Sequence, residues 1–84
     1  MKKYLALITI KLRSGILDVQ GKAVENALHS ISFNTMSNVR IGKYVELNVE
    51  ADTAETARSL VDDACKKLIA NPIIEDYFIE IKEV

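Results

Sequence analysis

Hydrophobic and polar residues alternate along the first segment of the chain, from Tyr4 to Leu12. One face of this segment is apolar throughout. The other face also begins with two large apolar residues, Leu5 and Leu7, before it becomes polar. A segment that is apolar on both faces is typical of a strand in the middle of a sheet, or of a strand that a partner covers.

Two later segments alternate with the same period of two. Residues 39–50 do so with an interruption at Gly42 and Lys43, which indicates either one long strand with a bulge or two strands joined there. Residues 74–84 alternate again, and Tyr77 and Phe78 fall on opposite faces. The pattern therefore predicts a sheet whose strands come from the start, the middle and the end of the chain.

Two further segments carry apolar residues at helical spacing. The first predicted helix covers about residues 19–31, and Asp18 stands in the position of its N-cap. The second begins at the sequence "DTAE", residues 52–55, which has the polar residue and the later Glu of a helix start. It ends at Asn71-Pro72, because the residue before a proline is displaced from helical geometry.

The order of elements is strand, helix, one broken or two strands, helix and strand. Such an order predicts an α+β fold, a two-layer sandwich of ferredoxin-like order β-α-β(β)-α-β, with both helices on one face of a mostly antiparallel sheet. Residues 1–84 form one domain, since the chain is too short for two cores. The other face of the sheet would carry either Leu5 and Leu7 or the opposite apolar set of the first strand, together with Tyr44 and Phe78, more apolar surface than a monomer leaves in water. We therefore expect a dimer or a larger assembly.

The composition excludes several kinds of partner. Eleven Lys and Arg residues stand against twelve Asp and Glu residues, so the formal net charge of −1 offers no field that attracts nucleic acid. No apolar run approaches the roughly 20 residues that a membrane-spanning helix requires. We expect a soluble, cytoplasmic protein without a nucleic-acid or membrane partner.

The residues that could carry catalysis do not form a recognisable set. His29 follows Glu25 at a spacing that favours a simple surface pair on a helix, and the single Cys65 is expected to be a packed thiol. No two residues have the spacing of zinc ligands, and no phosphate-binding loop is present. The sequence predicts no catalytic residue, no cofactor-binding residue and no metal site.

Two function classes remain open on the residues alone. One is an obligate small subunit of a larger enzyme, which the thin core and the two apolar sheet faces favour. The other is a free-standing ligand-binding regulatory module of ferredoxin-like build, in which a dimer interface would hold a metabolite.

Three stretches taken together point to the first class. "GILDVQGKAVENALHSISF", "NVRIGKYVEL" and "ACKKLIANPIIEDYFIEI" resemble the PurS family, the small subunit of phosphoribosylformylglycinamidine synthase in purine biosynthesis, over nearly the whole chain. The family pattern D-P-Q-G at the start of the first helix is D-V-Q-G here, with Val19 in the place of the proline. This change should loosen the start of the helix slightly, since proline presets the first helical residue.

The resemblance implies a complex of three proteins that acts as an ATP-dependent ligase. A large synthase subunit would use ATP and magnesium, and a glutaminase subunit would release ammonia from glutamine. The small subunit would itself be non-catalytic, form a homodimer or a dimer of dimers, bridge the other two subunits and assist ammonia transfer.

Gly21 poses a separate question, because a glycine in the first turn of a helix costs about 1 kcal/mol relative to alanine. It serves either close contact with a partner subunit or close packing inside the chain. Gly42 and Lys43 leave a similar choice, between a strand bulge aimed at an interface and a bulge with no such role. The residues expected at subunit interfaces are Leu5, Leu7, Gly21, Gly42, Lys43, Tyr44 and Phe78.

Overall fold

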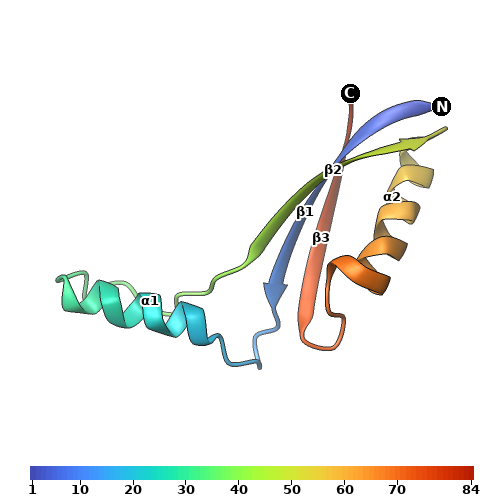
Figure 1. Ribbon diagram of the computed structural model, residues 1–84. Coiled ribbons are helices and arrows are strands. Elements are labelled where there is room, and N and C mark those ends of the chain that lie inside the picture. Colours follow the sequence, from blue (N-terminus) through green and yellow to red (C-terminus); the bar gives the residue numbers. More distant parts are fainter.

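The computed structural model describes all 84 residues, and it forms an elongated molecule of 52 × 26 × 14 Å. In chain order the elements are β1 (Lys2–Leu12), α1 (Val19–Ser30), β2 (Lys43–Ala51), α2 (Ala54–Ala64), the π-helical turn η1 (Cys65–Ile69) and β3 (Glu75–Glu83) (Figure 1). The predicted α+β class and the order of strands and helices are confirmed.

The three strands form one antiparallel sheet with the order β2-β1-β3. The strand that is apolar on both faces is indeed the central one. Its register places Leu7 between Glu46 and Glu80, and it places Thr9 between Tyr44 and Phe78. Since neighbouring strands share the same pleat, these residues all lie on one face of the sheet.

The second strand corrects the prediction for residues 39–50. Strand β2 begins only at Lys43, so neither a bulged long strand nor a second strand forms. Residues 39–41 instead follow α1, where the amides of Val39 and Ile41 bond to carboxylates of the helical segment. These side-chain acceptors replace a neighbouring strand, because each backbone N–H needs one acceptor and here receives it from the helix side.

Helix α2 covers one face of the sheet and completes the core. Its N-cap is Thr53, whose hydroxyl oxygen accepts a hydrogen bond from the Thr56 amide at 3.1 Å. The helix widens into η1, in which the Ala70 amide donates to the Cys65 carbonyl at 3.0 Å, and the chain leaves it at Asn71-Pro72 as predicted. The buried residues of this core are Tyr4, Ala6, Ile8, Ile10, Ala51, Ala57, Val61, Cys65 and Ala70.

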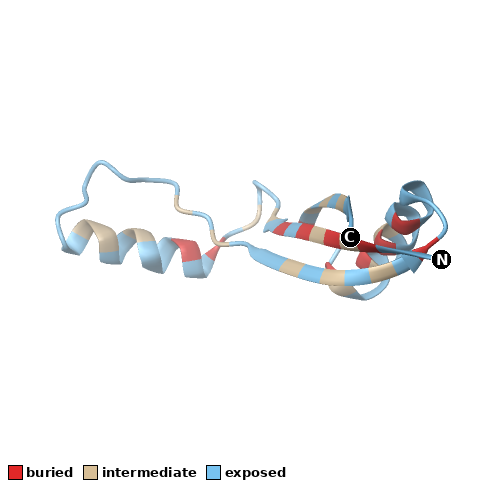
Figure 2. Cartoon of the chain, turned by 90° about the horizontal axis from the view of Figure 1, so that it is seen from above, coloured by how far each residue is buried: buried red, intermediate tan, exposed pale blue.

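Helix α1 does not lie where the sequence pattern placed it. Only α2 covers the sheet, whereas α1 extends away from the end of the sheet where β1 finishes and β2 begins (Figure 1). Within α1 only Gly21 is buried, and Figure 2 shows that burial is concentrated in the sheet and α2. Periodicity predicts that a helix has an apolar stripe, but it does not say which surface covers that stripe. Neither helix has the length and apolar character needed to cross a membrane.

Candidate subunit interfaces

The face of the sheet opposite α2, called the open face below, carries apolar side chains in its middle. Leu5 and Leu7 lie half-buried in the middle, on β1. Tyr44 on β2 and Phe78 on β3 lie on either side of Thr9, the next residue of β1 on this face, and are 59% and 58% exposed. The charged and polar residues on the same face are Lys3, Thr9, Lys11, Glu46, Asn48, Glu50, Asp76, Glu80 and Lys82. An apolar centre with a polar rim is the usual anatomy of a protein–protein interface.

Polar contacts order the two aromatic rings of the open face. The Tyr44 hydroxyl donates to Oε2 of Glu46 at 2.8 Å, and this bond raises the pKa of the phenol above its usual value. The ammonium of Lys11 lies 5.5 Å from the centre of the Phe78 ring, within the range of a cation–π contact. The two rings are thus held in place while their surfaces remain exposed, which suits them to contact a partner.

A second uncovered apolar surface lies on the segment that we call the arm, residues 17–42, which contains α1 and the chain that returns to β2. The returning chain is bonded along the helix. The amide of Phe33 donates to the Leu28 carbonyl at 2.9 Å, and Nε2 of His29 donates to the Met36 carbonyl at 2.7 Å. Large apolar side chains on the arm remain exposed: Leu17, Val19, Val24, Ile31, Phe33 and Met36.

Asp18 ties the two ends of the arm together at its base. One carboxylate oxygen accepts from the Gly21 amide, which caps α1, and the other accepts from the Ile41 amide on the returning chain, each at 2.7 Å. These two amides, with the nearby Arg40 guanidinium, lower the pKa of Asp18. The carboxylate therefore remains charged near neutral pH and holds both segments.

The requirement for glycine at position 21 comes from inside the chain. A Cβ on this residue would overlap the carbonyl oxygen of Val39 and the Asp18 carboxylate. At Gly42 a Cβ would lie 2.7 Å from the carbonyl oxygen of Ile10. Both glycines thus allow two stretches of backbone to approach each other closely, and Gly21 is buried in doing so.

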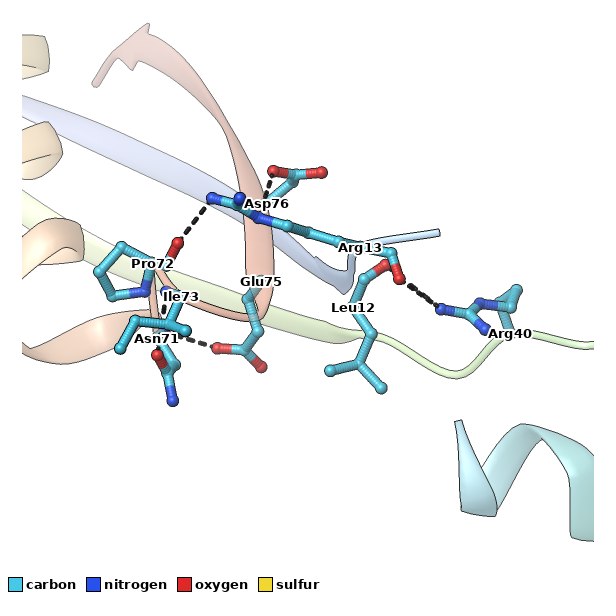
Figure 3. A network of polar contacts seen from close by, with 8 residues as sticks. All are labelled: Leu12, Arg13, Arg40, Asn71, Pro72, Ile73, Glu75 and Asp76. Carbon is cyan, nitrogen blue, oxygen red and sulfur yellow. Dashed lines mark hydrogen bonds and ion pairs between the residues drawn. The ribbon is translucent and has the colours of Figure 1, made fainter. Parts of the chain in front are cut away.

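The end of the sheet from which the arm leaves is held by charged and polar contacts (Figure 3). The Arg13 guanidinium donates to the Pro72 carbonyl at 2.6 Å and lies 3.3 Å from the Asp76 carboxylate. Glu75, which is buried, accepts from the Asn71 amide at 2.7 Å and lies 3.3 Å from the Lys43 ammonium. These two contacts lower the pKa of Glu75, the amide being the larger influence.

The two residues most often used in catalysis are far apart in this chain. His29 lies on the arm, whereas Cys65 is fully buried under α2 as the expected packed thiol. Burial, with a smaller influence from Asp62, raises the pKa of the Cys65 thiol and disfavours the reactive thiolate. No three His, Cys, Asp or Glu side chains come together as a metal site would require.

Comparisons with known proteins assign the chain to a family. The family model described as PurS, phosphoribosylformylglycinamidine (FGAM) synthase, matches residues 5–83. The chain belongs to the PurS family. It is 44% identical over 81 residues to the phosphoribosylformylglycinamidine synthase subunit PurS of Bacillus subtilis, which covers 96% of this chain and 95% of that protein.

The fold of the PurS family is the same in solved structures. A B. subtilis PurS crystal structure superposes with a TM-score of 0.85 over 95% of this chain and 99% of that chain. A structure of PurLQS from Thermotoga maritima contains a chain that is 32% identical, with a TM-score of 0.85 and full coverage of both chains. The resemblance that the three sequence stretches indicated is therefore confirmed.

Within this PurS fold, the predicted interface residues fall into two groups. Leu5, Leu7, Tyr44 and Phe78 gather on the open face, which is one of the two arrangements that the alternating pattern allowed. Gly21, Gly42 and Lys43 lie at the base of the arm instead. Sequence reasoning found Asp18 as a helix cap but missed its second bond, to Ile41, and missed Arg13 and Arg40 entirely. A cap position carries a local signal, whereas bonds across 23 or more residues carry none.

Proposed function

We propose that this chain is the small, non-catalytic subunit of phosphoribosylformylglycinamidine synthase, an ATP-dependent ligase of purine biosynthesis in the cytoplasm. The observation that carries the proposal is similarity to PurS proteins from end to end of both chains. The structure adds support of a different kind. It presents two uncovered apolar surfaces, the open face and the arm, and such surfaces are typical of a protein that works by assembly.

The partners follow from the same family assignment. One is a second copy of the chain, in a dimer or a dimer of dimers, and the others are the large synthase subunit and the glutaminase subunit. The open face, with Leu5, Leu7, Tyr44 and Phe78, offers one apolar surface for such contacts, and the arm offers the other. Gly42 and Lys43 lie beside it at the start of β2.

The chemistry is divided between the subunits. The large subunit uses ATP and magnesium to activate the substrate amide, and the glutaminase subunit supplies ammonia. This chain holds the two together and helps to exclude water between them, because ammonia in bulk water is diluted and protonated. In this division the small subunit needs surfaces that fit its partners, and it needs no catalytic residue.

Reconstitution of the three subunits tests this function. Synthesis with glutamine as nitrogen source should require this chain, while synthesis with ammonium chloride should depend on it much less. Leu7→Glu, which puts a charge into the centre of the open face, should weaken assembly and lower glutamine-dependent synthesis at least tenfold. Asp63→Asn, on the exposed side of α2, is the matched control and should change neither. Full glutamine-dependent synthesis without the chain would refute the proposal.

A further inference from the structure

The arm is joined to the rest of the molecule at one place. The outgoing link, residues 13–18, and the returning residues 39–42 come together between the end of β1 and the start of β2 (Figure 1). Helix α1 does not pack against the sheet, so nothing along its length fixes its direction. Whatever sets the direction of the arm must therefore act at this base.

The base contains bonds that run from the returning chain to the outgoing one. Asp18 reaches across to the Ile41 amide, as described above, and it is only 6% exposed, although most residues of the arm are exposed. The side chain of Arg40, on the returning chain, extends toward the outgoing chain. Its guanidinium donates to the carbonyls of Leu12 at 3.4 Å, Arg13 at 3.1 Å and Ile16 at 3.2 Å, all on the outgoing side. Figure 3 shows Arg40 beside Leu12 and Arg13.

The chemistry of Asp18 and Arg40 allows each of them to join the two segments of the base. The Asp18 carboxylate uses both oxygens on amides that point from different segments, which a side chain with a single acceptor cannot do. The planar guanidinium of Arg40 spans three carbonyls with a fixed fork of donors, which a lysine cannot reproduce. Gly21 completes the base, since the absence of a side chain lets the Val39 carbonyl approach the first turn of α1.

We propose that Asp18 and Arg40 form a latch that fixes the direction in which the arm leaves the sheet, and that this direction positions the arm for assembly. Asp18 is then a positioning residue, because it is buried and both of its carboxylate oxygens are already bonded to backbone amides of the arm. The second half of the proposal rests on the proposed function, whereas the first half concerns the chain alone.

Hydrogen exchange of the backbone amides tests the first half. Asp18→Asn keeps the size of the side chain and removes one of its two acceptors. We expect the amides of Ile41 and of the arm to exchange about tenfold faster or more, while the amides of β1 and β3 keep their protection. Asp63→Asn removes an equal charge from an exposed site and should leave both regions unchanged. Unchanged exchange in the arm, or equal acceleration throughout the chain, would overturn the latch.

A distance measurement between the arm and the sheet, with a second variant, distinguishes a change in the direction of the arm from a local increase in amide exchange. Spin labels at Asn34→Cys near the arm tip and Glu50→Cys on β2 report the direction of the arm, and the native Cys65 is too buried to react. With labelled chains diluted in unlabelled protein, Arg40→Gln and Asp18→Asn should each broaden the distance distribution. A distribution as narrow as that of the parent in both variants would refute the latch.

Binding to the large and glutaminase subunits then tests the second half. An unlatched variant should bind them at least tenfold more weakly than the parent. If Asp18→Asn loosens the arm and yet binds as tightly as the parent, the positioning role is wrong. If the parent itself fails to bind, the proposed function is wrong, and the exchange and distance results still decide the latch.

Discussion

The body of the molecule, which comprises the sheet, α2 and η1, and the arm are held in shape by different forces. The body buries apolar side chains, with Ile8, Ile10 and Cys65 enclosed between β1 and α2. In the arm only Asp18 and Gly21 are buried, and neither is a large apolar residue (Figure 2). The arm keeps its form through side chains that bond to backbone, chiefly Asp18, Glu25 and Arg40.

This difference indicates what each region needs from its surroundings. Apolar burial stabilises the body from within the chain, because the favourable free energy comes from surface already removed from water. A 12-residue helix such as α1 is marginal in water without such burial. We therefore expect the arm to gain much of its stability from the subunits that cover it, and four predictions test this contrast.

The largest effect should come from emptying the core of the body. Ile8→Ala removes a side chain that is 0% exposed and should lower the free energy of unfolding by about 2–5 kcal/mol. Ile31→Ala makes the same deletion on the arm, where the side chain is 63% exposed, and should cost less than about 0.5 kcal/mol in the separate chain. Denaturant unfolding followed by circular dichroism measures both, and equal losses would contradict the contrast.

A smaller effect should follow from filling the base of the arm. Helix propensity alone predicts that Gly21→Ala stabilises the chain by up to about 1 kcal/mol. The added Cβ would meet backbone and carboxylate, so we expect the arm to lose about 1–3 kcal/mol, measured by exchange of the Ile41 amide. Gly15→Ala is the control, because a Cβ there meets nothing within 4 Å. A more stable Gly21→Ala variant would show that the backbones can move apart.

A still smaller effect is expected from a polar contact on the edge of the body. The Tyr77 hydroxyl donates to Oδ1 of Asp62 at 2.6 Å, and this bond raises the pKa of Tyr77 to about 12. Asp62→Asn should bring that pKa back toward the usual value of about 10 in an ultraviolet titration. The melting temperature should change little, since apolar burial maintains the body. A loss as large as that of Ile8→Ala would be evidence against this view.

Acid should produce the mildest change, and it should begin in the arm. The pKa of Asp18 is lowered by the amides of Gly21 and Ile41, so its bonds stabilise the folded arm above the unfolded pKa of about 4. That stabilisation is lost as the pH falls through the lower, folded pKa. Exchange of the Ile41 amide, corrected for its intrinsic pH dependence, should accelerate below about pH 4 in the parent. In Asp18→Asn this acceleration should be absent, and its persistence there would assign it to other carboxylates.

The sequence predicted the body well and the arm only in part. The alternation from Tyr4 to Leu12 located the central strand, because a strand covered on both faces must be apolar on both. The cap at Asp18, the start of α2 and the stop at Pro72 are local signals, and they were found. The start of β2 at Lys43 was not found, because residues 39–41 alternate like a strand but donate their amide hydrogen bonds to the carboxylates of Asp18 and Glu25.

The sequence by itself determined the order of strands and helices, most of their bounds, and the family to which the chain belongs. These properties depend on short-range periodicity and on the order of motifs along the chain. Only the tertiary structure decided that α1 leaves the sheet and that Asp18 and Arg40 join chain segments 23 or more residues apart. A hydrophobic stripe specifies that a surface is to be covered, but the covering surface depends on three-dimensional contacts that periodicity does not encode.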